Sequence, residues 1–272
     1  MGGLYAGAAD VALMGREIWP SEQLAYFQTM GHNASGVEVA TGSFDVPTKA
    51  DALVIFVHKD NPLSRITFAQ LDGIFGAEHR RASKNHRAWA DLGLAGSWSA
   101  QPIHAYGPQI DNAAAIFFSN KVMKGSRKWN PDYAEFANRT DAAGRRTDYG
   151  KLILDALALD RYGIAISNPH YAGPQVKALA VVTDDESAPL APTREVAPTR
   201  DTVLHRTYPL TRSVFIFFNR DVNHQPGSGL DPAVLEFLRY VLSADGQSQV
   251  LREGAYLPLP ANIAQQELQK LH

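Results

Sequence analysis

Polar residues that could hold an anion follow a short apolar strand in the stretch from Tyr106 to Met123, YGPQIDNAAAIFFSNKVM. The strand enters a turn at Gly107-Pro108, and Asp111 and Asn112 then precede a helical run over 113–122. Either of these two residues can cap the helix, as Asp and Asn commonly do. The first N–H groups of a helix lack partners within it and lie at the positive end of its dipole. The order of strand, polar turn and helix therefore indicates either an ordinary capped connection or an anion-binding turn.

A second polar turn, Gly15-Arg16-Glu17, follows a short buried strand predicted over 10–14. In open α/β sheets, ligands bind beyond the carboxyl ends of the strands, so this turn is placed to contact one. A surface turn with a solvated Arg–Glu pair explains the same residues. The residues alone leave both interpretations open.

A basic segment over 79–87 is the third candidate. It contains two histidines and four cations: His79, Arg80, Arg81, Lys84, His86 and Arg87. Such a cluster could contact phosphate or an acidic partner, but the nearly neutral chain favours a solvated loop. The two histidines are seven residues apart with no further ligand nearby, so we predict no metal site there.

Composition excludes several classes of chemistry. The chain has no cysteine, which excludes disulfides, thiolate metal sites and a cysteine nucleophile. Its net charge of −2 gives no global electrostatic case for a nucleic-acid or membrane partner. No apolar run reaches the roughly 18 residues needed to span a bilayer. There is no GxSxG, Walker A, HExxH or GxGxxG motif, so we predict a binding protein rather than an enzyme, without cofactor or metal.

Short strands and helices alternate along the chain, which is typical of an α/β fold. Strands are predicted over 10–14, 52–58, 103–106, 162–167, 176–182 and 213–219, and helices over 21–30, 68–75, 113–122, 151–159, 233–242 and 244–253. Ser21, Thr67 and Asp231 are the expected N-caps, and Gly254 is the expected end of the last helix. Residues 31–49 are expected to be loop or weak strand, 76–101 a long polar connection, 126–146 polar and irregular, and 184–201 a surface loop.

Two long apolar strands, 53–58 and 213–219, bracket the middle of the chain. This arrangement predicts two lobes joined by two crossing strands, one made of 1–58 and 210–272 and the other of 59–209. Ligands favour the cleft between such lobes. The residues 4–14 read like the end of a helix, a turn and a strand, so we expect the first lobe to lack an N-terminal part, and no signal peptide is visible.

Five segments of the chain resemble a known family in the family's own order. They are AGAADVALMGREIWPSE at 6–22, DALVIFVHKDNPLSRITFAQLDGIF at 51–75, PIHAYG with FFSNKV at 102–122, YPLTRSVFIFFN at 208–219, and LSADGQSQVLREGAYLPLP at 242–260. Together they resemble the PstS-like phosphate-binding proteins of ABC importers, a branch of the type II periplasmic binding proteins. The resemblance implies two α/β lobes with a hinge and an anion held by helix N-termini. It also implies a monomer, an ABC permease as partner, and a periplasmic or extracytoplasmic location after export.

The sequence departs from that family in two places. The family's opening strand and its Gly-Ser-Thr-type ligand loop have no counterpart. The second ligand loop resembles Arg-x-x-Gly-Ser-Gly-Thr, and here its Arg falls on Pro108, its Ser on Asn112, its second Gly on Ala113 and its Thr on Ala114. Charge-assisted and hydroxyl hydrogen bonds to a buried anion contribute about 1.5–3 kcal/mol each. Losing three weakens phosphate affinity by several powers of ten unless other groups replace them.

The candidate ligand residues combine the two polar turns. They are Gly15, Arg16, Asp111, Asn112, Ala113 and Ala114. The resemblance places a ligand on the first turn, where Arg16 can restore a positive charge, and backbone N–H groups of 112–114 can serve as donors. Asp111 can accept a proton from a hydrogen phosphate but repels a fully ionised anion. The leading hypothesis is capture of phosphate or a related oxyanion for an ABC importer. The alternative is a degenerate relative that binds another solute or acts as a sensing or interaction module.

Overall fold

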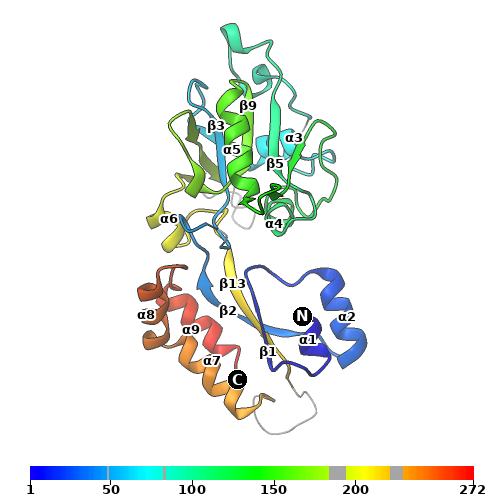
Figure 1. Cartoon of the computed structure of the whole chain (residues 1–272), viewed down its shortest axis with the longest axis vertical. Helices are drawn as coiled ribbons and strands as arrows, with labels where there is room; N and C mark the ends of the chain where they lie inside the picture. The colour runs from blue at the N-terminus through cyan, green and yellow to red at the C-terminus, as the bar shows by residue number, and fades with distance from the viewer. Residues whose placement is uncertain (48, 82–83, 184–193, 221–228) are drawn as a thin grey trace. The chain divides into compact units, whose positions relative to one another are not determined.

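The computed structural model describes residues 1–47, 49–81, 84–183, 194–220 and 229–272 (Figure 1). These residues form two compact units. The first comprises Met1–Asp51, Leu204–Arg206 and Thr211–His272, and the second comprises Ala52–Val203 and Thr207–Leu210. The lobe boundaries predicted from the sequence stay a prediction. The contacts of the chain place residues 52–58 in the second unit.

An antiparallel three-stranded sheet with the order β1-β13-β2 lies at the centre of the first unit. Its strands are β1 (Val11–Met14), β13 (Ser213–Phe218) and β2 (Ser35–Thr41). Val11 pairs with Phe218, and Ser213 pairs with Thr41. β13 is almost wholly apolar because it is the middle strand and both of its faces are covered.

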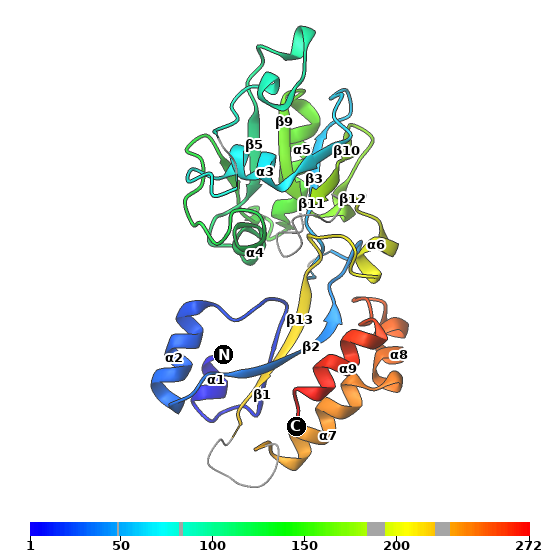
Figure 2. The same ribbon diagram turned by 180° about the vertical axis from the view of Figure 1, so that it is seen from behind.

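Helices cover both faces of this sheet, as Figures 1 and 2 show. On one face lie α7 (Pro232–Leu242), α8 (Ala244–Glu253) and α9 (Ala261–Gln269), which share a core with β2 and β13. On the other face lie α1 (Gly2–Tyr5) and α2 (Pro20–Met30), which pack through Leu4 and Tyr26 against Phe217. Burial of apolar side chains on both faces supplies most of the stability of such a layered unit.

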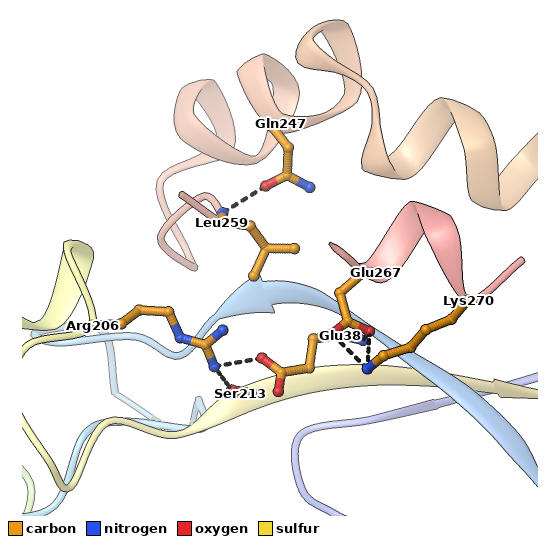
Figure 3. Close-up of polar contacts among 7 residues, drawn as sticks. All are labelled: Glu38, Arg206, Ser213, Gln247, Leu259, Glu267 and Lys270. Carbon is orange, nitrogen blue, oxygen red and sulfur yellow. Dashed lines mark hydrogen bonds and ion pairs between the residues drawn. The ribbon is translucent and has the colours of Figure 1, made fainter. Parts of the chain in front are cut away.

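A buried glutamine joins α8 to its neighbours in the first unit (Figure 3). The Gln247 Nε2 atom donates to the carbonyl oxygen of Val39 at 3.0 Å and to that of Val241 at 2.9 Å. The Leu259 N–H donates to Gln247 Oε1 at 2.7 Å. Since buried polar groups cost free energy unless they are bonded, this side chain fixes the position of α8 against β2.

An ionic network joins α9 to the same strand (Figure 3). The buried carboxylate of Glu267 accepts from the Glu38 N–H at 3.0 Å and from Lys270 Nζ at 2.6 Å. Arg206 forms an ion pair with Glu38 and also donates to Ser213. Residue 206 is thereby held against both β2 and β13.

A five-stranded mixed sheet with the order β10-β3-β9-β5-β6 lies at the centre of the second unit. Its strands are β10 (Val176–Ala178), β3 (Val54–His58), β9 (Gly163–Ser167), β5 (His104–Pro108) and β6 (Ala134–Phe136). β5 runs parallel to β9 and β6, whereas β3 runs antiparallel to both of its neighbours. The helix α5 (Tyr149–Leu159) packs on this sheet through Ile153, Leu154 and Leu157.

The remaining elements of the second unit are shorter. They are the sheet β12 (Arg194–Val196), β11 (Ala180–Thr183) and β4 (Arg65–Thr67), the pair β7 (Arg139–Thr140) and β8 (Arg146–Thr147), the helices α3 (Phe68–Phe75), α4 (Ala113–Lys121) and α6 (Arg200–Leu204), and the 3₁₀ helices η1 (Trp89–Leu92), η2 (Gly96–Trp98) and η3 (Pro169–Tyr171).

The predicted α/β class is confirmed, and several predicted helix ends are correct. Thr67 caps α3 through its hydroxyl, which accepts from the Gln70 N–H at 3.0 Å. Asp231 caps α7 by accepting from the Ala233 N–H at 2.8 Å. Gly254 ends α8 in the left-handed conformation, with φ of 74°.

Other expectations were wrong. Ser21 does not cap α2, because the helix begins at Pro20 and the Trp19 N–H donates to Glu22 at 2.9 Å. The expected strand over 176–182 is divided between two sheets at Leu179. The segment 31–49, expected as loop or weak strand, contains the strand β2. Helix α9 was not anticipated, and residues 184–193 of the expected loop over 184–201 lie outside the described residues.

Candidate ligand-binding turns

The first candidate turn connects β5 to α4 in the second unit. Asn112 is the N-cap, because its Oδ1 atom accepts from the Ala114 N–H at 2.9 Å. The Asn112 N–H donates to the carbonyl oxygen of Gln109 at 2.8 Å, which closes the turn. Asp111 is exposed and does not cap the helix. The structure therefore decides between the two capping residues that the sequence left open.

This capped helix end keeps backbone donors available. The Ile116 N–H donates to the Asn112 carbonyl at 3.0 Å and so closes the first helical turn. Within the described residues, no hydrogen bond engages the N–H groups of Ala113 and Ala115. The Ala113 N–H lies at the positive end of the helix dipole on a partly exposed residue and can bind an anion, whereas Ala115 is fully buried.

A buried tyrosine holds the strand end that precedes the turn. The Tyr133 hydroxyl donates to the Pro108 carbonyl oxygen at 2.6 Å, and burial raises the pKa of this phenol. A Cβ atom at Gly107 would meet the Tyr133 hydroxyl at 2.3 Å, so only glycine fits there. The turn is thus positioned by a rigid aromatic contact rather than by its own residues alone.

Arg16, on the second candidate turn in the first unit, is engaged by its neighbours. Its two terminal nitrogens each lie 2.7 Å from a carboxylate oxygen of Glu22, and its guanidinium carbon lies 3.9 Å from the centre of the Trp19 ring. The hydrogen bonds from Arg16 hold the pKa of the Glu22 carboxyl below its usual value. The charge of Arg16 is therefore compensated, and only its remaining N–H donors are open to a ligand.

Gly15 is tied to the sheet by a residue that sequence reasoning missed. The Arg212 Nη2 atom donates to the Gly15 carbonyl oxygen at 3.0 Å. Arg212 is only 7% exposed, which is unusual for arginine and indicates a structural contact. The one available sequence signal was an arginine directly before the apolar strand SVFIFF.

The structure brings the predicted site residues together in two separate groups. Asp111, Asn112, Ala113 and Ala114 form one turn in the second unit, and Gly15 with Arg16 forms the other in the first. Their assignment as ligand residues stays a prediction.

Neither a metal-binding cluster nor a membrane-spanning helix is found among the described residues. Across the ranges that the structure describes, no three His, Cys, Asp or Glu side chains are arranged to hold a metal ion. His79 Nε2 and His86 Nδ1 are buried without a hydrogen bond, and burial lowers the pKa of His86. None of the described helices combines the length and apolar character that crossing a bilayer requires.

Comparison with known proteins gives consistent matches. A family profile described as "PBP superfamily domain" matches residues 3–245. The phosphate-binding protein PstS of Pseudomonas aeruginosa is 30% identical over 270 residues, which cover 98% of this chain and 73% of the relative. Protein SphX of Synechococcus elongatus is 27% identical over 221 residues, which cover 80% of this chain and 56% of the relative.

Two solved structures share the fold. A possible phosphate binding protein from Planctomyces limnophilus superposes with a TM-score of 0.59 at 20% identity, covering 99% of this chain and 82% of that chain. An ABC-type phosphate transport receptor from Vibrio cholerae superposes with a TM-score of 0.59 at 18% identity, covering 95% of this chain and 83% of that chain. At such identities the likeness concerns the fold alone.

Proposed function

Since the chain belongs to the PBP superfamily, among the PstS-like phosphate-binding proteins, we propose that it captures phosphate or a related oxyanion for an ABC importer. The match to PstS along almost the entire chain is the observation that carries this proposal. In this role the protein is a solute-binding component without catalysis. An ABC permease is its partner, and it acts as a monomer at a periplasmic or extracytoplasmic location.

The turn before α4 supplies the main donors in this proposal. The Ala113 N–H binds a ligand oxygen, and the Asn112 cap fixes its direction. Asp111 accepts a hydrogen bond from the O–H of a protonated oxyanion, which favours hydrogen phosphate over a fully ionised anion such as sulfate. These contacts take the place of the arginine and hydroxyl donors absent from this turn.

The turn at Gly15 and Arg16 supplies further donors. Because Glu22 compensates the charge of Arg16, the guanidinium contributes directed N–H groups rather than a net positive charge. Binding of a divalent anion is then weaker than at a turn with a free arginine. We propose that Gly15, Arg16, Asp111, Asn112, Ala113 and Ala114 form the ligand-contacting turns. The N–H groups of Asn112 and Ala114, expected as donors, are engaged by Gln109 and by the Asn112 side chain, so Ala113 provides the open backbone donor.

The alternative of a degenerate relative is not favoured. It was motivated by Pro108, Ala113 and Ala114 in place of the family's ligands. Several of the relatives and solved structures that match the chain carry names of phosphate-binding or phosphate-transport proteins, which supports the importer role instead.

A thermal-shift titration tests the proposal. A ligand that binds only the folded state stabilises it by about 2.7 kcal/mol at a concentration 100 times Kd. We expect phosphate to raise the melting temperature in a saturable way, and sulfate at equal ionic strength to have a smaller effect. Equal shifts from both salts would indicate a general salt effect and contradict the proposal.

A further inference from the structure

Five exposed cations lie on the segment after α3 and on the end of α4 with the segment that follows it, in the second unit. Figure 2 labels both helices. This basic cluster consists of Arg80, Lys121, Lys124, Arg127 and Lys128. The two segments are joined by backbone contacts, because the Ala77 N–H donates to the Lys128 carbonyl at 2.9 Å. Arg80 Nη1 also donates to the Lys124 carbonyl at 2.9 Å, so the cluster is a defined surface.

The cluster is strongly positive although the whole chain is slightly negative. Its five cations share the two segments with a single acidic residue, whereas Lys84 and Arg87, farther along the first segment, pair with Asp91 and Asp132 at 2.8 Å each. The single acidic residue, Glu78, contacts Arg80 at 2.7 Å and Lys128 at 3.0 Å. The hydrogen bond from Lys128 is the largest cause that lowers the pKa of Glu78 to about 2, so it compensates one cation throughout the physiological range. Within the described chain, Lys121 and Arg127 have no acidic partner.

The cluster stands on a rigid base and exposes no apolar anchor. Arg81 donates to the carbonyl oxygens of Val122 at 2.6 Å and Lys121 at 3.0 Å, which fixes the end of α4. The nearby Trp129 ring is only partly exposed and stacks on Tyr133 with a centroid distance of 4.6 Å. A partner of this surface must therefore be recognised by charge rather than by insertion of an apolar side chain.

We propose that the basic cluster docks the protein on an anionic bilayer surface, through lipid phosphate headgroups. Lys121 and Arg127 are exposed and have no acidic partner among the described residues, and exposed cations spread over two segments suit a diffuse sheet of negative charge. A specific acidic protein partner would instead favour cations held in fixed bidentate geometry. Each lysine or arginine close to an anionic membrane strengthens binding by about fivefold. This proposal does not depend on phosphate capture, because it concerns a different surface.

Vesicle co-sedimentation of the full chain tests the docking surface. We expect binding to vesicles of equal parts phosphatidylglycerol and phosphatidylcholine, and none to phosphatidylcholine alone. Raising the salt from about 0.1 M to about 1 M shortens the Debye length from about 10 Å to about 3 Å and should release the protein. Binding that resists salt, or equal binding to both vesicles, would overturn an electrostatic docking surface.

A matched pair of double variants separates the cluster from net charge. Lys121→Gln with Arg127→Gln removes two cluster cations that hold no ion pair, and should weaken vesicle binding by about 10- to 30-fold. Arg139→Gln with Arg146→Gln removes two exposed cations from β7 and β8 and should leave binding unchanged. An equal loss in both variants would show that net charge alone is responsible and would refute the proposal.

A polyglutamate titration compares an acidic polypeptide with the anionic vesicles as the partner of the basic cluster. If the full chain binds polyglutamate through the same two cations but does not bind the anionic vesicles, the partner is an acidic protein and the membrane proposal is wrong. A melting temperature equal to that of the wild type shows that each variant is folded.

Discussion

Replacing Glu22 with glutamine tests how firmly the turn at Arg16 is built. In the wild type, the Glu22 carboxylate accepts two hydrogen bonds of 2.7 Å from Arg16 and one of 2.9 Å from the Trp19 N–H. Glutamine keeps one acceptor oxygen but presents an NH₂ group to the guanidinium. One charge-assisted hydrogen bond is lost, which is worth about 1.5–3 kcal/mol when buried. Because Glu22 is 23% exposed, we expect a loss of about 1–2 kcal/mol.

The melting temperature reports this loss directly. For a chain of this size, 1 kcal/mol corresponds to about 2–4 °C, so Glu22→Gln should melt several degrees below the wild type at neutral pH. The folded-state pKa of Glu22 is lowered from its usual 4.5, so its stabilising effect is present above pH 4.5. The effect is lost as the pH falls through the folded-state pKa, and the two proteins should then converge.

An exposed ion pair gives the control for this experiment. Glu195→Gln breaks the pair between Arg65 and Glu195, whose side chains are 66% and 45% exposed, and should change stability by less than about 0.5 kcal/mol. Melting temperatures of Glu22→Gln and wild type that agree at neutral pH would refute the reasoning. In that case the contacts of Arg16 with Glu22 contribute nothing to the fold.

Three further predictions concern the two turns and a buried histidine. Asn112→Asp keeps a good N-cap and therefore the melting temperature, but its negative charge should weaken phosphate binding at least about tenfold in calorimetry. Asn112→Ala loses the cap and should cost about 1 kcal/mol of stability. If Asn112→Asp bound phosphate as tightly as the wild type, this turn would not belong to the site. Arg212→Met removes the hydrogen bond to the Gly15 carbonyl. It should lower the free energy of unfolding in urea by about 1–3 kcal/mol and weaken phosphate binding. A folded variant with unchanged phosphate affinity would show that Gly15 needs no such support. Because burial lowers the pKa of His86 below 6.5, the wild type should lose stability as the pH falls below 6.5, and His86→Leu should lose less; parallel pH profiles would contradict this.

Local chemistry made several elements predictable from the sequence. Thr67 with Gln70 forms a capping box, and Asp231 before a proline opens a helix, because these contacts span only a few residues. Gly254 ends its helix because glycine adopts a positive φ without steric cost. For the same reason, the sequence limited the cap of α4 to two candidates.

Elements that depend on distant partners were not predictable. The strand β2, SGVEVAT, lacks a regular alternation of polar and apolar residues, and its register is set by pairing with β13, more than 170 residues away. The helix α9 has no side-chain cap, and its polar sequence buries Ala264 and Glu267 only because β2 supplies partners. Neither signal exists within a local window.

The candidate site also has a part that the sequence predicted and a part that only the structure shows. The resemblance located the turn at Gly15 and Arg16, but only the structure shows that Glu22 and Trp19 engage the guanidinium. The contact between Arg212 and Gly15 spans 197 positions and has no sequence signature. Sequence reasoning therefore found the turns, whereas the contacts that fix them required the fold.

Isothermal titration calorimetry with inorganic phosphate tests the central claim most directly. We predict saturable one-to-one binding to the 272-residue chain, tighter than about 1 mM and weakened at least about tenfold in Asn112→Asp. The absence of binding heat, in a sample whose melting curve shows it to be folded, would contradict the assignment of this protein as a phosphate receptor.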